Sequence, residues 1–196
     1  MSIAEKLTTI AENQQKVYDK GRQSGNKEVW GALQNYGNPH TYYYAFCYDR
    51  LDDSSYNPQY DIVCANTNTA AMSIFYSNKS ITDTKVPIYV YKNAQAIFCD
   101  AANLKRIALL IPTQDTTWNN AFSGAYALED ITMGGTIGQN ISFSACTKLT
   151  HDSLMSIIEH LGKVSATRTL TLGSTNLAKL TDAEKAIATE KGWTLA

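Results

Sequence analysis

The chain has 196 residues, a formal net charge of −1 and only 18% charged residues. This length provides one large or two small domains with a substantial core. The near-neutral charge argues against a basic surface for nucleic acid or anionic lipid, so we expect neither partner. No apolar run approaches the length of a membrane span, and the first residues do not resemble a secretory signal. We therefore expect a soluble protein without membrane insertion.

Residues 1–37 are predicted to form an N-terminal helical segment. Ser2 and Glu5 have the spacing of a capping box and Gly21 follows the last turn, which predicts a helix over residues 2–20. One stripe of this helix is apolar with a single glutamine: Ile3, Leu7, Ile10, Gln14 and Val17. Such a stripe is typical of a helix that packs against a partner. Docking on the same chain and self-association with other copies both remain hypotheses. A second, short helix is expected at 27–35.

Residues 38–74 form a tyrosine-rich segment that is expected to be β-structure. Ten of the twelve tyrosines lie between Tyr36 and Tyr91, and strands are predicted at 42–48 and 60–64. Tyrosine fits half-buried sheet faces, which is the commoner case, but it also supplies rigid contact area on recognition surfaces. Under the second interpretation, the candidate binding surface consists of Tyr42, Tyr44, Tyr48, Tyr89 and Tyr91.

Residues 75–154 contain one spaced set of residues four times. The copies begin at nearly even intervals, at Phe75, Phe98, Phe122 and Phe143. In the two clearest copies the later positions are Ala101, Leu104, Ile107 and Leu109, and Ala125, Leu128, Ile131 and Met133. The first and last copies are degraded and read Asn78, Ile81, Thr84 and Val86, and Cys146, Leu149, Asp152 and Leu154. This period is typical of a solenoid whose turns bury their apolar edges by stacking. We expect about four turns, a short strand at each Leu-x2-Ile-x-Leu segment, and Phe98 lying directly over Phe122.

Residues 155–196 are expected to cap the end of the repeats. Helical spacing begins just before this segment and replaces the strand of the last copy, with Thr150 or Asp152 as N-cap and an apolar face of Leu154, Ile157, Ile158 and Leu161. An alternating strand is predicted at 167–173. Thr181 and Glu184 then open a second helix that ends before Gly192, with Trp193 folding back on it. The predicted fold class is therefore α+β: an N-terminal helix, a short irregular solenoid and a helix–strand–helix cap.

The sequence contains no recognisable catalytic, cofactor or metal motif. The cysteines at 47, 64, 99 and 146 are scattered and are expected to be small buried groups, although a Cys47–Cys64 disulfide is left open. His151 and His160 lack a glutamate in zinc-site spacing, so surface or capping roles are expected. Acidic residues cluster loosely in the first half of the chain and are expected to be solvated loop residues: Asp49, Asp52, Asp53, Asp61, Asp83 and Asp100. A glycosidase-like carboxylate pair or a calcium site is left open, although no spacing singles out two of them. We therefore expect a non-enzymatic protein without a cofactor.

The repeat copies resemble leucine-rich repeats of the BspA type, whose unit is approximately Ala-Phe-x2-Cys-x2-Leu-x2-Ile-x-Leu-Pro. Residues 121–131 read Ala-Phe-Ser-Gly-Ala-Tyr-Ala-Leu-Glu-Asp-Ile and match this unit closely. Alanine replaces the usual cysteine in the two clearest copies, and Thr84 and Asp152 break the isoleucine position. The resemblance covers the central part of the chain, 75–154, and implies a repeat solenoid.

The chain as a whole resembles tail-associated proteins of phages and prophages of gut Firmicutes. Three parts carry this resemblance: residues 3–13 with Val17 and Tyr18, the degenerate repeats, and the closing segments 170–173, 176–181 and 192–195. It implies a structural protein of the virion, in the tail tip or baseplate or in receptor binding, that is present in the host cytoplasm during assembly. The implied partners are other virion proteins, further copies of the chain, and a glycan or protein on the host surface. The alternative is a bacterial cell-surface adhesion module with the same repeats.

Overall fold

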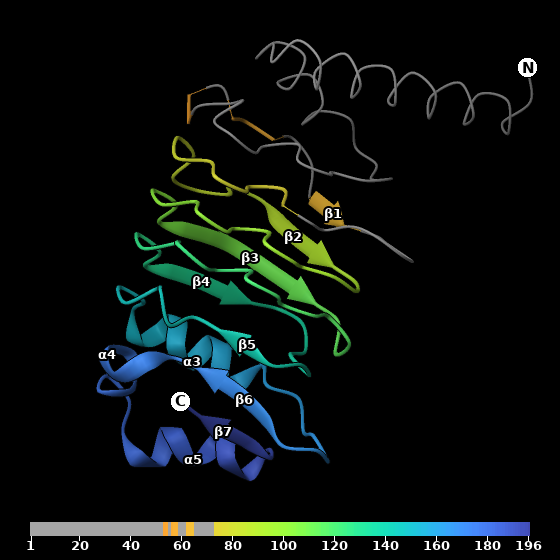
Figure 1. Cartoon of the computed structure of the whole chain (residues 1–196), viewed down its shortest axis with the longest axis vertical. Helices are drawn as coiled ribbons and strands as arrows, with labels where there is room; N and C mark the ends of the chain where they lie inside the picture. The colour runs from red at the N-terminus through yellow and green to blue at the C-terminus, as the bar shows by residue number, and fades with distance from the viewer. Residues whose placement is uncertain (1–52, 55, 59–61, 65–72) are drawn as a thin grey trace, which may run out of the picture.

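The computed structural model describes residues 53–54, 56–58, 62–64 and 73–196. This part is an α/β protein with two small parallel sheets and three helices (Figure 1). The first sheet has the order β1 (Ile62–Cys64), β2 (Pro87–Val90), β3 (Arg106–Pro112) and β4 (Asp130–Met133). The second consists of β5 (Ile141–Ser142), β6 (Arg168–Thr171) and β7 (Trp193–Leu195). The helices are α3 (His151–Glu159), α4 (Gly173–Leu177) and α5 (Asp182–Glu190).

The expected mixture of helices and strands is confirmed, but the class α+β is not, because every strand pair in the two sheets is parallel. The predicted helices in 1–37 and the strand at 42–48 lie outside the described residues. Within the described residues, no helix has the length and apolar character needed to cross a membrane.

Strands β3 and β4 reproduce the repeat seen in the sequence. Ile107 is paired with Ile131, its equivalent in the next copy, and a register shift follows before Leu110 meets Met133. Both strands fall where the Leu-x2-Ile-x-Leu segments predict them. In the first copy the strand was predicted at 81–86 but begins at Pro87. Lys85 interrupts the extended backbone with a φ of 62°. Thr84 uses its hydroxyl to accept the Ala108 N–H at 3.0 Å.

The phenylalanines of the four copies form one buried stack. Ring centroids lie 5.5 Å apart for Phe75 and Phe98 and for Phe98 and Phe122, and 4.3 Å apart for Phe122 and Phe143. Each of the four side chains is at most 1% exposed. The prediction that Phe98 lies over Phe122 is therefore confirmed.

A second ladder of backbone hydrogen bonds joins the segments that carry these phenylalanines. The N–H groups of Ala96, Phe98 and Asp100 donate to the carbonyls of residues 119, 121 and 123 at 2.7–2.9 Å. The same pattern joins residues 73–77 to 95–99. Residues with a positive φ recur at matching places in it: Ser73, Ser77, Ala96, Asp100, Asn120 and Gly124. The backbone of the chain thus turns tightly in the same way in three successive copies.

Helix α3 closes the free edge of β4, as expected from the helical spacing in the fourth copy. Thr150 is its N-cap and accepts a hydrogen bond from the Ser153 N–H. The Ser153 hydroxyl accepts the Ile131 N–H, and the Ser156 hydroxyl accepts the Met133 N–H, both at 2.9 Å. Serine side chains therefore satisfy the strand amides that a further parallel strand would otherwise pair.

The C-terminal part contains the predicted strand and capped helix and two elements that were not predicted. Strand β6 lies within 167–173, and Thr181 and Glu184 form the capping box of α5. Helix α4 was missed because it depends on the Asn176 amide, which donates to the Leu172 and Cys146 carbonyls. Trp193 does more than fold back on α5, because it begins strand β7 and donates its indole N–H to the Gly162 carbonyl at 2.8 Å.

Candidate functional site

The structure brings together two of the five tyrosines of the candidate binding surface. Tyr89 lies on β2 between the buried Ile88 and Val90, and Tyr91 follows just after the end of the strand. Alternate side chains of an extended segment point to the same face. Tyr89 is half-buried, and Tyr91 is 45% exposed. Tyr42, Tyr44 and Tyr48 lie outside the described residues.

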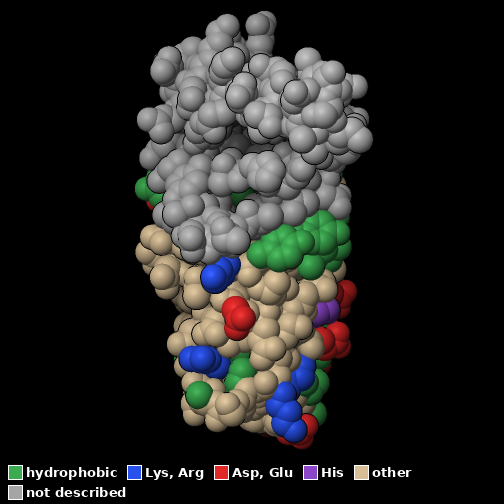
Figure 2. Space-filling model, turned by 90° about the vertical axis from the view of Figure 1, so that its right-hand side faces the viewer, with side chains coloured by type: hydrophobic (Ala, Val, Ile, Leu, Met, Phe, Trp, Pro, Cys, Tyr) green, Lys and Arg blue, Asp and Glu red, His purple; other side chains and the backbone are tan. Residues whose placement is uncertain are grey.

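Apolar side chains of β3 extend this tyrosine face. Pro87 and Tyr89 pair with Leu109 and Ile111, and all four are half-buried. The other face of β2 and β3 carries the buried Ile88, Val90, Ile107 and Leu110. Figure 2 shows hydrophobic side chains gathered on one side of the molecule, beside the residues that are not described. The outer face of the first sheet therefore carries aromatic and aliphatic side chains that are partly exposed.

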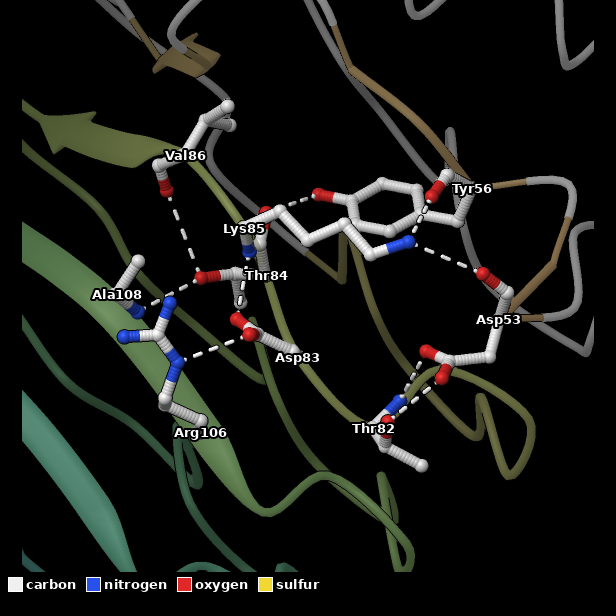
Figure 3. A network of polar contacts seen from close by, with 9 residues as sticks. All are labelled: Asp53, Tyr56, Thr82, Asp83, Thr84, Lys85, Val86, Arg106 and Ala108. Carbon is white, nitrogen blue, oxygen red and sulfur yellow. Dashed lines mark hydrogen bonds and ion pairs between the residues drawn. The ribbon is translucent and has the colours of Figure 1, made fainter.

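A network of polar contacts anchors Asp53 and Tyr56 on the loop before β2 (Figure 3). The Asp53 carboxylate accepts the Thr82 N–H at 2.9 Å and the Thr82 hydroxyl at 2.8 Å. The Lys85 ammonium group donates hydrogen bonds to the main-chain carbonyls of Asp53 and Tyr56. The Tyr56 hydroxyl, in turn, donates to the Thr84 carbonyl at 2.8 Å.

Asp83 completes this network and is paired on both oxygens. It accepts the Arg106 Nε–H at 2.8 Å and the Lys85 main-chain N–H at 2.7 Å. Three of the carboxylates that the sequence placed in solvated loops are described. Asp100 is exposed, as predicted, whereas Asp53 and Asp83 accept hydrogen bonds where two chain segments meet. Their contacts join residues Asp53 and Tyr56 to the loop before β2.

The two described histidines have the surface and capping roles that the sequence predicted. The Nε2 of His151 lies 2.9 Å from Glu184 Oε1, which links the first turns of α3 and α5. His160 is the C-cap residue of α3. Among the described residues, no group of three potential ligands is placed to hold a metal ion.

The described cysteines are free thiols at or beside repeat positions. Cys146 is fully buried, as predicted, whereas Cys99 is only half-buried. Burial raises the pKa of the Cys146 thiol to about 12. Burial and, secondarily, the neighbouring Asp100 carboxylate raise the pKa of Cys99. The side chains of Cys47 and Cys64 lie outside what the structure describes.

Cys146 is expected to resist alkylation in the folded protein. At about pH 8, roughly one thiol in 10⁴ is ionised at this pKa, and only the thiolate reacts. Iodoacetamide treatment followed by peptide mass mapping should find Cys99 modified before Cys146, and both modified after unfolding in urea. Modification of Cys146 at the rate of Cys99 without urea would contradict the buried position.

A hollow of about 210 Å³ lies between the start of the third repeat copy and the start of the fourth. Its lining residues are Trp118, Asn120, Ala121, Phe122, Ser123, Ser142, Ser144 and Ala145. None of these side chains is ionisable, so the hollow offers hydrogen bonds and apolar contact but no acid or base. Sequence reasoning identified Phe122 as a core residue and missed the hollow. The only sequence signal was the spacing between Phe122 and Phe143, which is shorter than that between the earlier copies.

No protein-family model matches the chain, and no curated protein or solved structure is significantly similar to it.

Proposed function

We propose that this chain is a non-enzymatic repeat protein that provides an attachment or assembly surface in a phage virion, at the tail tip or baseplate or in receptor binding. Its central part is a solenoid of about four BspA-like leucine-rich repeats, closed by the C-terminal elements. The observation that supports this most is the stack of Phe75, Phe98, Phe122 and Phe143 at the repeat spacing.

A further position of the repeat supports the leucine-rich assignment. Leucine-rich repeats place Asn or Cys at one buried position of each unit. Here the corresponding residues are Asn78, Ala101, Ala125 and Cys146, each at most 1% exposed. The Asn78 side-chain oxygen accepts the N–H groups of Ser80 and Ile81 at 2.9 and 2.8 Å. Asn78 thus binds backbone amides of its own turn. In the two clearest copies the smaller Ala101 and Ala125 occupy the same buried position.

The C-terminal elements have the properties of a solenoid cap. The end of a stack of repeats exposes apolar surface and unpaired strand amides that need covering. Helix α3 provides serine hydroxyls to β4, and α5 contacts both α3 and β7. Figure 1 places the second sheet and α5 at the end of the stack opposite β1.

The outer tyrosine face is the proposed attachment surface, because it combines exposed aromatic area with a rigid parallel sheet. Aromatic anchors on a rigid support lose little conformational entropy on binding. The bacterial cell-surface adhesion module uses the same surface and stays the alternative assignment.

Detection of the chain in purified particles tests the virion assignment. Phage particles are induced from a strain that encodes the gene, banded by density, and analysed by quantitative mass spectrometry. We expect the chain at a fixed ratio to the major tail protein, and its gene beside tail genes. Recovery on the bacterial envelope, with none in the particles, would favour the adhesion module.

Leu7→Asp is expected to abolish self-association through the N-terminal helix. A carboxylate in the apolar stripe cannot be desolvated between two helices without a large cost. Light scattering coupled to size exclusion should give an oligomer for the unchanged chain and a monomer for Leu7→Asp. Gln15→Asp is the matched control, since it adds the same charge outside the stripe. A monomeric unchanged chain would remove self-association from the proposal.

A further inference from the structure

The outer tyrosine face has the sequence pattern of a sheet face that is covered. Strands of parallel sheets that are buried on both faces read as continuous apolar runs, whereas strands with one solvated face alternate. Strand β3 carries five consecutive apolar residues at 107–111. Strand β4 alternates instead, with Asp130 and Thr132 exposed and Ile131 and Met133 buried. The cover that this pattern indicates therefore belongs over β2 and β3.

The described residues leave this face partly open. Pro87, Tyr89, Leu109 and Ile111 are half-buried and Tyr91 is 45% exposed, whereas Ile88, Val90 and Leu110 on the other face are fully buried. None of the five outer side chains is charged, so covering them does not require the desolvation of an ion. Aromatic residues without charged neighbours are typical of the core of a protein interface.

The predicted N-terminal helix carries a matching apolar surface. Its stripe of Ile3, Leu7, Ile10, Gln14 and Val17 contains no charged residue and lies outside the described residues. Helices cover sheets through an apolar stripe of this kind. A helix over residues 2–20 is roughly 28 Å long, which is enough to cross two neighbouring strands that lie about 4.8 Å apart.

The chain is anchored beside this face where its N-terminal part ends. Asp53 accepts two hydrogen bonds from Thr82 on the loop before β2, and Lys85 binds the carbonyls of Asp53 and Tyr56. Residues 21–52 span at most roughly 110 Å, so the helix can reach the face of its own copy or of a second one. The self-association proposed above requires the second copy. Exchange of the same element between two copies is a low-cost route to a dimer and covers both faces at once.

We propose that the apolar stripe of the N-terminal helix and the outer tyrosine face are the two halves of one interface, in which the helix of each copy packs on β2 and β3 of a second copy. The stripe is buried against Tyr89, Leu109 and Ile111, and Tyr91 lies at the rim. The face then serves the assembly of copies. This interface rests on the proposed self-association and names the surface that receives the helix.

Tyr91→Asp and Leu109→Asp test the face, because each places a carboxylate where the helix would have to desolvate it. Light scattering coupled to size exclusion should give a dimer for the unchanged chain and a dissociation constant at least about ten-fold higher for each variant. Urea unfolding checks that each variant is folded, and Tyr91→Asp, at the more exposed position, keeps the test valid if Leu109→Asp fails to fold.

Tyr126→Asp is the matched control, since it makes the same change at a tyrosine that is 62% exposed in another repeat copy. It should leave the dimer intact. An oligomer that survives both face variants but is lost in Leu7→Asp would overturn this interface, and self-association by pairing of the helices would remain.

Mixing two variants distinguishes exchange between copies from docking within one copy. Leu7→Asp keeps an intact face and Leu109→Asp keeps an intact stripe, so neither should dimerise alone, whereas their mixture retains one of the two contacts. Native mass spectrometry should therefore find a heterodimer in the mixture, and its absence at the highest soluble concentration would overturn the exchange. A monomeric unchanged chain that loses stability in Leu7→Asp would place the helix on its own copy. That result would overturn this interface together with the proposed self-association, while the analysis of purified particles still decides the virion assignment.

Discussion

Phe122→Ala is expected to lower the free energy of unfolding by about 3–5 kcal/mol. Phe122 is fully buried and contacts Phe98, Phe143 and Trp118, with ring centroids 5.5, 4.3 and 6.1 Å away. Removing its ring leaves a cavity between two neighbouring rings of the stack, and the rigid backbone ladder at 96–100 limits how far the structure can collapse into it. Urea unfolding followed by tryptophan fluorescence gives the free energy.

Tyr126→Ala is the matched control for this variant. Tyr126 belongs to the same repeat copy but is 62% exposed. Its removal is expected to change the free energy of unfolding by no more than about 0.5 kcal/mol. Equal effects of Phe122→Ala and Tyr126→Ala would mean that the phenylalanine stack does not hold successive copies together.

Gly135→Ala is expected to cost about 3 kcal/mol, near the upper end for overpacked positions. A Cβ atom at Gly135 would lie 2.0 Å from the Pro112 carbonyl oxygen and 2.9 Å from the Pro112 nitrogen. Both are backbone atoms of the preceding copy, and the Thr136 N–H donates to the same Pro112 carbonyl at 3.2 Å. The two backbones must therefore separate to admit a methyl group, which breaks this hydrogen bond. Thermal unfolding monitored by circular dichroism measures the loss.

Gly134→Ala provides the comparison for this effect. Replacing either glycine with alanine restricts the backbone of the unfolded chain to the same extent. At Gly134 the added Cβ would meet side-chain atoms, with the Leu109 Cδ1 at 2.9 Å and the Ile111 Cγ1 at 3.1 Å. We expect a cost of about 1 kcal/mol, below that of Gly135→Ala, because these two side chains can shift without separating the backbones. A larger loss for Gly134→Ala than for Gly135→Ala would show that backbone contact between copies is not the limiting factor.

The repeat positions were predictable because the same types of residue recur at fixed spacing in successive copies. The separation in sequence from Phe98 to Phe122 equals that from Ile107 to Ile131. The same spacing therefore predicts both the stacked phenylalanines and the paired isoleucines of the core. The Thr181 cap was equally predictable, since an N-cap depends on residues within one turn of the helix. For α3 the sequence offered Thr150 or Asp152, and the structure has Thr150.

The candidate site was predictable only in part. The sequence grouped Tyr89 and Tyr91 as surface residues, and strand alternation places them on one face with Leu109 and Ile111. The hollow was missed because its lining comes from two repeat copies, residues 118–123 and 142–145. The distance between these two segments depends on tertiary hydrogen bonds and not on a local sequence pattern. The Asp53 junction was missed for a related reason, since its partners Thr82 and Lys85 come from a distant part of the chain.

The sequence by itself determined the period of the repeat, the residues that stack in its core and the capped ends of α3 and α5. These features depend on spacing along the chain and on hydrogen bonds within one turn. Only the tertiary structure decided that β2 begins at Pro87, that Asn176 holds α4 against Cys146, and that Trp193 adds a strand to β6. Each of these outcomes requires a backbone group from a distant segment as hydrogen-bond partner, and no local pattern specifies which segment supplies it.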